Sequence, residues 1–241
     1  MKDQLELAGV VLQAQPYKEF DKRLVILTRE RGLVTAFARG ARRQSSPLLA
    51  SANPFVFGHF ALYEGKNAYT LVGVNVTDYF AELPHCQPGV YYGFYFLELA
   101  MYFGREGLEA EETVNLIYVT LRALAKGVQS PELIRRIFEI RLLTENGLYA
   151  LPPDKGSLDE SAYYALAFVS SAPISRLYSF SLSEKAMADF AKEAEKHRRK
   201  QVDIPLKSLP LIDEKNSFLY TFDEYRADPE KGDKHNGKDN G

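Results

Sequence analysis

Apolar and β-branched residues alternate with polar ones through residue 76, in short runs separated by turns that contain Gly, Pro or Asn. This period of two predicts half-buried β-strands. The five predicted strands cover residues 7–14, 23–28, 33–40, 55–63 and 68–76. Pro16 is expected to end the first strand, and a polar turn at residues 29–32 is expected to join the second and third strands as a hairpin.

Two glycines lie inside these predicted strands. Gly58 and Gly73 occupy positions where a glycine often marks a bulge or a tight bend of a curled sheet. Five short antiparallel strands with interior glycines fit a small closed barrel better than an open sheet. An OB-like barrel is one member of that set.

From residue 78 onward the hydrophobic period becomes helical. The predicted helices cover residues 90–104, 111–127, 131–147, 161–171 and 183–200. The first is apolar nearly all round, which indicates a central, buried helix. Strands followed by helices predict an α+β chain, in which an OB-fold-like small β-barrel precedes an all-helical C-terminal domain.

The domain organisation follows from this change of period. We expect a barrel domain at residues 1–80, a helical domain at residues 81–227 and a polar, low-complexity tail at residues 228–241 that is predicted to be disordered. No apolar run approaches the length of a membrane span, and the N-terminal residues lack the apolar core of a secretory signal. The single cysteine, Cys86, excludes an internal disulfide and fits a reducing compartment. The predicted location is the cytoplasm.

The charge is unevenly distributed along the chain. The formal net charge is -2, yet residues 1–43 carry nine basic and five acidic side chains, a net +4 that leaves -6 for the remainder. Arg39, Arg42 and Arg43 surround Gly40 at the exit of the third predicted strand. Basic charge that is concentrated in one segment indicates contact with a polyanion more strongly than the same charge spread evenly over the surface.

Motifs for catalysis are weak or absent in the sequence. It contains no Gly-x-Ser-x-Gly elbow and no glycine-rich phosphate-binding loop. Glu109, Glu111 and Glu112 form an acidic group that fits a solvated helix start better than a metal site. We therefore predict no enzymatic activity, no metal and no cofactor.

The basic segment is the strongest candidate for a binding site. Cations on a small curled sheet, with aromatic rings nearby, are typical of surfaces that bind single-stranded nucleic acid. Tyr17 and Phe20 are candidate stacking rings, although Phe20 and Phe37 are more simply explained as core residues. The alternative is that the arginines only solvate the rim of a barrel. The candidate DNA-binding residues are Tyr17, Lys18, Lys22, Arg23, Arg39, Arg42 and Arg43.

Four segments of the chain carry a further set of motifs. Residues 9–43 read GVVLQAQPYKEFDKRLVILTRERGLVTAFARGARR, with a Tyr-x-Glu-x-Asp-Lys-Arg loop, a strand that ends in Leu-Thr and an Arg-Gly-Ala-Arg-Arg exit. Residues 54–80 form the next predicted hairpin, FEIRLLTENGLY stands at residues 138–149 and HRRKQVDIPLKSL at residues 197–209. Together these segments resemble the RecO family of bacterial recombination mediators, the first two its N-terminal domain and hairpin. The likeness covers most of residues 9–210.

One departure from the family pattern concerns zinc. Many members carry a four-cysteine zinc site after the helix that here ends near residue 147. This chain has LPPDKG at residues 151–156 and no cysteine there. We expect a short linker near residues 148–158 to replace the zinc module.

The resemblance implies a non-enzymatic DNA repair protein. Such proteins bind single- and double-stranded DNA, anneal complementary strands and act with RecR to help RecA replace single-strand-binding protein (SSB). The implied partners are DNA, RecR, the acidic C-terminal tail of SSB and, indirectly, RecA, and the implied location is nucleoid-associated. Side chains expected to contact the SSB tail, unless they merely solvate helix surfaces, are Arg135, Arg136, Arg141, Arg198, Arg199 and Lys200.

Two other functional classes compete with this interpretation. The chain could be a protein-interaction adaptor whose barrel and helical domain bind acidic peptides without direct DNA binding. A metal-dependent nuclease is the other class, but the sequence offers no convincing set of carboxylates for it. Strand binding at low salt separates the mediator from the adaptor.

Overall fold

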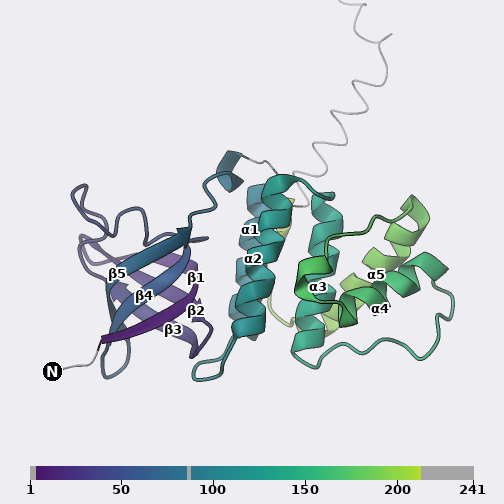
Figure 1. Ribbon diagram of the computed structural model, residues 1–241, viewed down its shortest axis with the longest axis horizontal. Coiled ribbons are helices and arrows are strands. Elements are labelled where there is room, and N and C mark those ends of the chain that lie inside the picture. The colour runs from purple at the N-terminus through teal and green to yellow at the C-terminus, as the bar shows by residue number, and fades with distance from the viewer. Residues whose placement is uncertain (1–3, 86–87, 213–241) are drawn as a thin grey trace, which may run out of the picture.

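A β-barrel forms one end of the molecule and a group of helices forms the other (Figure 1). The computed structural model describes residues 4–85 and 88–212. The polar tail predicted at residues 228–241 lies outside the described residues. The strands are β1 (Gln4–Tyr17), β2 (Asp21–Thr28), β3 (Gly32–Ala38), β4 (Phe57–Glu64) and β5 (Tyr69–Asp78).

The five strands close into a barrel in the order β1-β2-β3-β5-β4. β3 and β5 pair in parallel, and the other four neighbouring pairs are antiparallel. A closed barrel of five strands followed by helices confirms the predicted OB-type fold class.

The alternation read from the sequence is visible in β3. Val34, Ala36 and Ala38 are buried inside the barrel, whereas Thr35 and Phe37 point outward. Because the side chains of a strand alternate between its two faces, the same strand supplies both the barrel core and part of its outer surface. The outer surface of β1, β2 and β3 carries the candidate site described below.

Close strand approach explains the glycines. Gly9 of β1 lies opposite Gly58 of β4, and a Cβ atom on Gly58 would come within 2.4 Å of the Asn75 carbonyl oxygen. The register of β4 against β5 shifts beside Gly58 and again close to Gly73, as the interior glycines indicated. A side chain at Gly9 or Gly58 would separate the strands, so the tight curl of the barrel depends on its absence there, whereas a Cβ atom on Gly73 would meet only the Ala61 Cβ at 4.0 Å.

The observed strand boundaries differ from the predicted ones by a few residues, and two of the differences have a clear structural reason. β1 continues through Pro16, which is the register partner of Lys22 one pair before the end of the hairpin, so the proline removes a donor only near the strand end. β4 begins at Phe57: the Phe55 amide still donates to the Val11 carbonyl at 3.1 Å, but the φ of 72° at Phe55 interrupts the regular strand. The Phe55 ring instead contacts Phe94, with 4.8 Å between ring centroids.

The helices follow the predicted order. They are α1 (Gly89–Phe103), α2 (Glu111–Lys126), α3 (Pro131–Glu145), α4 (Glu160–Ser171) and α5 (Glu184–Gln201), with 3₁₀ turns η1 (Leu83–His85) and η2 (Ile174–Arg176). The Ser130 side chain caps α3 by accepting a hydrogen bond from the Leu133 amide. Gly127 ends α2 with a φ of 59°, a left-handed conformation that glycine adopts without strain.

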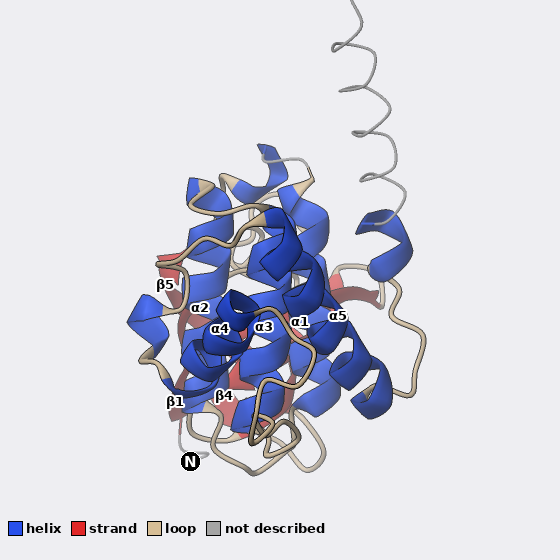
Figure 2. Cartoon of the chain, turned by 90° about the vertical axis from the view of Figure 1, so that its right-hand side faces the viewer, coloured by secondary structure: helices blue, strands red, loops and turns tan. Residues whose placement is uncertain are grey.

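α1 is the central helix, as its apolar sequence predicted. Tyr92, Tyr95 and Phe96 are almost completely buried in a core shared by the helices and one face of the barrel. α1 and α2 stand between the barrel and the other helices in Figure 1, and the strands lie behind the helices in Figure 2. No helix in the described part of the chain is long and apolar enough to cross a membrane.

Backbone hydrogen bonds join one end of the barrel to the helices. The turn between β2 and β3 pairs with the loop between α1 and α2: the Leu33 amide donates to the Arg105 carbonyl at 3.0 Å, and the Gly107 amide donates to the Arg31 carbonyl at 2.9 Å. The Ala110 amide donates to the Arg29 carbonyl at 2.9 Å. This end of the barrel is therefore attached to the helices. The opposite end, which carries the β1–β2 turn and the loop after β3, is not attached to them and is called the open end below, although Ala41, Leu48 and Ala52 of that loop pack into the barrel core.

Candidate nucleic-acid interface

Two loops meet at the open end of the barrel. The β1–β2 turn and the long loop after β3 are joined by the Arg42 amide, which donates to the Phe20 carbonyl at 2.9 Å. The Arg42 guanidinium also donates to the Glu19 carbonyl at 3.0 Å, and the Gly40 amide donates to Asp21 Oδ1 at 2.8 Å. These hydrogen bonds fix the Arg-Gly-Ala-Arg-Arg segment against the preceding hairpin. Gly40 adopts a φ of 65°, which allows the sharp turn that brings the segment there.

Basic side chains gather here without carboxylate partners. Within residues 4–85 and 88–212, none of them lies within ion-pair distance of an Asp or Glu. Unpaired cations this close together create a positive potential that attracts a polyanion. We call this group the basic end; it consists of Lys18, Lys22, Arg23, Arg39, Arg42 and Arg43.

Two aromatic rings are exposed beside these cations. Tyr17 and Phe20 each leave 39% of their surface accessible to solvent, so the core position considered for Phe20 is wrong. The Arg43 guanidinium lies 4.9 Å from the centroid of the Phe20 ring, and the Lys18 ammonium lies 5.5 Å from that of Tyr17. Exposed rings next to cations provide surfaces on which bases can stack.

Strand register extends this surface along the outside of the barrel. Arg23 of β2 is the register partner of Phe37 on β3 and of Gln15 on β1, so the three side chains share the outer face. The half-buried ring of Phe37 lies 4.6 Å from that of Tyr17. Local sequence does not indicate this ring pair, because its members are 20 residues apart. The alternation of β3 together with the hairpin register is the signal that could have found it.

Lys22 differs from the other members of the basic end. Its ammonium group points inward and donates to the Ala52 carbonyl at 3.0 Å and to Asn53 Oδ1 at 2.7 Å. Partial burial, together with the nearby charge of Arg42, lowers the pKa of Lys22. Lys22 therefore holds the loop after β3 in place, and its charge faces the protein more than the solvent.

The arginines expected to contact a partner on α3 lie inside the protein, which corrects the expectation for Arg135 and Arg136. Their exposed fractions are 4% and 8%, and both bind Glu139, which is also buried. Arg136 reaches Glu195 of α5 as well, with 2.6 Å between Nη1 and Oε2. These charges join two helices and are not available to an acidic peptide.

The same correction applies to two further arginines. Arg198 of α5 is buried and binds Glu195 at 2.5 Å. Arg141 pairs with Glu145 at 3.0 Å and donates to the Ala172 carbonyl at 2.9 Å, so it ties α3 to the end of α4. The exposed members of the expected partner surface are Arg199 and Lys200.

The fold and the site define a class: an OB-type barrel with an open basic and aromatic end, fixed through its other end to a helical domain. Comparison with known proteins identifies the family. The family model "Recombination protein O N terminal" matches residues 1–80, and "Recombination protein O C terminal" matches residues 89–151.

Curated relatives agree with this match. The DNA repair protein RecO of Alkaliphilus metalliredigens is 35% identical over 144 residues, which cover 60% of this chain and 58% of that protein, under two thirds of its length. RecO of Acetivibrio thermocellus is 26% identical over 86% of this chain and 96% of its own length, and RecO of Clostridium perfringens is 28% identical over 78% and 89%. The chain belongs to the RecO family of DNA repair proteins.

Proposed function

We propose that this chain is a recombination mediator that binds single- and double-stranded DNA at the basic end and promotes the annealing of complementary strands. With RecR, it would help to load RecA onto DNA coated by SSB, acting at the chromosome in the cytoplasm and without catalysing a reaction of its own. The observation that carries the proposal is the group of unpaired cations beside the exposed rings of Tyr17 and Phe20, at the open end of an OB-type barrel.

Annealing requires two strands to be held close without being fixed in sequence. Phosphate contacts supply affinity and carry no sequence information, so exposed arginines can neutralise both backbones while base pairing decides which strands remain together. Arg39 and Arg43 have exposed guanidinium groups suited to this role. Stacking on Tyr17 and Phe20 would hold unpaired bases apart from each other until they meet a complement.

The proposal divides the chain into a DNA-binding domain at residues 1–80 and a helical domain at residues 81–227. The segment at residues 148–158, which follows α3, takes the place of the family's zinc module and contains buried Tyr149. For the acidic tail of SSB, the proposed contact is reduced to Arg199 and Lys200, since the other four arginines are engaged inside the protein.

A salt titration with fluorescent single-stranded oligonucleotides tests the proposal. The logarithm of the association constant should fall linearly with the logarithm of salt concentration, with a slope of about -0.7 per phosphate neutralised. Replacing Arg39, Arg42 and Arg43 together by alanine should make that slope shallower by about 2, because three contacts are lost. An unchanged slope removes these arginines from the site.

A charge-matched control separates a local site from the effect of net charge. Lys126, Lys155 and Lys192 are exposed and lie in the helical part of the chain, so their triple alanine variant loses the same charge. It should bind with nearly the parent slope. If both triple variants lose strand affinity equally, binding is diffuse and not confined to the basic end. If the parent binds acidic peptides but no DNA strand at low salt, the chain is the protein-interaction adaptor considered above.

A further inference from the structure

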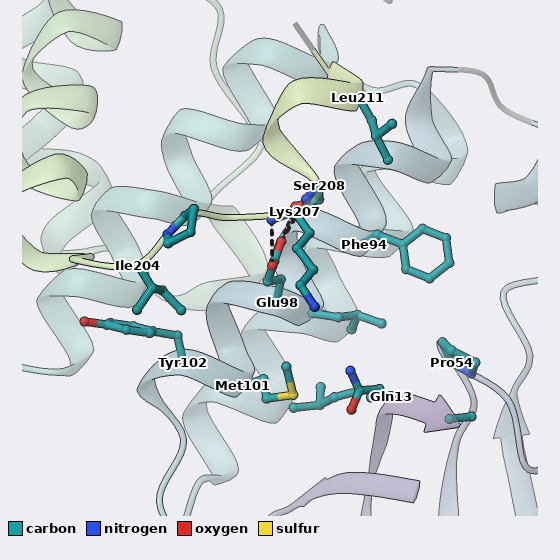
Figure 3. A pocket seen from close by; sticks show the side chains of 14 residues that line it. Gln13, Pro54, Phe94, Glu98, Met101, Tyr102, Ile204, Lys207, Ser208 and Leu211 are labelled. Carbon is teal, nitrogen blue, oxygen red and sulfur yellow. Dashed lines mark hydrogen bonds between the residues drawn. The ribbon is translucent and has the colours of Figure 1, made fainter. Parts of the chain in front are cut away.

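An apolar groove runs between the barrel, α1 and the segment that follows α5 (Figure 3). Its volume is about 650 Å³. The lining side chains come from β1, the loop before β4, α1 and the segment after α5, and Figure 3 shows them around the same space. The apolar side chains that define it are Leu12, Pro54, Phe94, Met101, Ile204 and Leu211.

Three of these side chains are unusually exposed for large apolar residues. Phe94, Ile204 and Leu211 are each more than two-fifths accessible, and they border one groove instead of being scattered over the surface. Contiguous exposed apolar surface marks a site where another group binds. No described residue covers the groove.

The outer wall of the groove is firmly held. The Glu98 carboxylate of α1 accepts hydrogen bonds from the Lys207 amide at 2.8 Å, the Ser208 amide at 3.0 Å and the Ser208 hydroxyl at 2.5 Å. The segment ends at Ile212, which is completely buried, one residue after Leu211 of the wall. The groove is therefore formed before any occupant arrives, and the chain continues from its edge.

The sequence that continues from this edge has the composition of an occupant. Residues 213–226 read DEKNSFLYTFDEYR, whereas residues 228–241 contain no residue with an apolar side chain other than proline. Phe218 lies six positions after Ile212. At roughly 3.4 Å per residue this stretch reaches up to about 20 Å, which is enough to return across the groove.

Charge complementarity points in the same direction. Lys207 reaches over the groove towards Met101 and Gln13, as Figure 3 shows, and its ammonium has no ion-pair partner among the described residues. The nearby carboxylate of Glu98 is fully used by its three donors. The continuing segment carries Asp223 and Glu224 directly after its apolar residues.

We propose that residues 218–225 of the same chain are the occupant of this groove. Phe218 and Phe222 bind against Phe94, Met101 and Leu211, and the acidic pair lies near Lys207. The occupied groove is closed to peptides of similar chemistry from other proteins. The segment thus acts as an internal competitor for the docking surface between the barrel and the helices.

The absence of tryptophan from the sequence allows a direct test. A full-length Phe218→Trp variant carries a single indole, whose emission should be blue-shifted and whose quenching by acrylamide should be several-fold weaker than in a synthetic peptide of residues 213–226 with the same substitution. Adding Leu211→Asp or Ile204→Asp, both at exposed groove positions, should raise quenching to that of the peptide. Circular dichroism verifies that these variants fold.

A matched control places the same charge elsewhere. Tyr164→Asp alters an exposed apolar residue on α4, outside the groove, and should leave indole emission unchanged. Emission like that of the free peptide, unaffected by the groove variants, would overturn the proposal. Blue-shifted emission that is lost on dilution would also overturn it, because the occupant would then come from a second copy.

A second measurement does not depend on the reporter. A fluorescent peptide of residues 213–226, added to the full chain, should bind weakly, since its own segment competes. It should bind several-fold more tightly to a full-length Phe218→Ser and Phe222→Ser double variant, and Leu211→Asp should abolish this gain. Equal binding to the parent and the double variant contradicts self-occupancy.

Discussion

Arginines at the open end of the barrel and arginines on α3 and α5 are put to opposite uses. At the basic end, Arg39 and Arg43 are exposed and have no carboxylate within ion-pair distance in the described chain. On α3, Arg135 and Arg136 are buried and share Glu139. An unpaired exposed charge contributes little to folding and is available for a ligand, whereas a paired buried charge is committed to the fold.

Nearby carboxylates distinguish the buried arginines of α3 from those of the basic end, and the pKa values of Arg135 and Arg136 reflect these carboxylates. Burial alone would lower the pKa of Arg135 and Arg136, but Glu139 and Glu132, together with the other groups beside them, outweigh burial and raise both values. Burial raises the pKa of Tyr95 well above its usual range, and Glu139, which accepts its hydroxyl hydrogen bond, adds to the rise. The helices thus depend on one buried carboxylate that several groups share.

The largest expected effect comes from removing that carboxylate charge. Glu139→Gln removes the most deeply buried carboxylate that Arg135 and Arg136 share, while Glu132 and Glu195 remain beside both. We expect the free energy of unfolding to fall by about 3 kcal/mol, the lower end of the range for a broken buried pair. Urea unfolding followed by circular dichroism measures the loss. Glu160→Gln, at an exposed position of α4, is the matched control. A loss no greater than the control's would show that the pairing is dispensable.

Strong acid should weaken the contacts between the same helices. Burial alone would raise the pKa of Glu195, but hydrogen bonds from Arg136, Arg198 and Arg199 lower it to about 2. Because the folded-state pKa lies below the unfolded value, this carboxylate stabilises the fold above pH 4.5, and the contribution is lost as pH falls towards 2. Thermal unfolding between pH 6 and 2 should show a steeper decline in the parent than in Glu195→Gln. Parallel curves would contradict the assignment.

A smaller loss of stability is expected for Lys22→Met. The substitution keeps the aliphatic stem but removes the ammonium that donates hydrogen bonds to Asn53 Oδ1 and to the Ala52 carbonyl. The free energy of unfolding should fall by about 1–3 kcal/mol. Because the ammonium faces inward, we expect weaker strand binding with almost the parent salt slope. If the salt slope of strand binding becomes shallower by as much as on loss of an exposed arginine, Lys22 is in direct contact with phosphate.

The smallest effect on stability is expected for Arg39→Ala. This exposed side chain makes no hydrogen bond or ion pair in the described chain, so the unfolding free energy should change by no more than about 0.5 kcal/mol. Strand affinity at low salt should nevertheless fall. If Arg39→Ala lowers stability but leaves strand binding unchanged, the arginines of the basic end would serve the fold, as those of α3 and α5 do, and the contrast would be contradicted.

Sequence reasoning succeeded where local pattern decides the structure. The alternation in the barrel strands and the helical period after residue 78 depend on neighbouring residues, so the elements and the fold class were predictable. The extension of β1 through Pro16 was not, because it depends on pairing with β2 across the hairpin.

Partners distant in sequence account for the failures at the site. The basic run at the end of α5 looked exposed, yet Arg198 is buried against Glu139, 59 residues earlier. Glu132 and Glu139, three or four positions from Arg135 and Arg136, were a local sign of pairing within α3. Lys22 could not be distinguished from its neighbours, because its acceptors lie 30 and 31 residues along the chain.

The seam between the β2–β3 turn and the α1–α2 loop has a consequence for mutational tolerance. Its hydrogen bonds join main-chain atoms, so most side-chain replacements along it leave the attachment of barrel to helices intact. Two glycines are exceptions: a Cβ atom on Gly32 would come within 2.1 Å of the Arg105 carbonyl oxygen, and Gly107 adopts a φ of 76°, which strains any other residue. Genetic vulnerability of the seam is therefore concentrated in glycine codons, while the surfaces on either side of it can diversify without changing how the two halves are oriented.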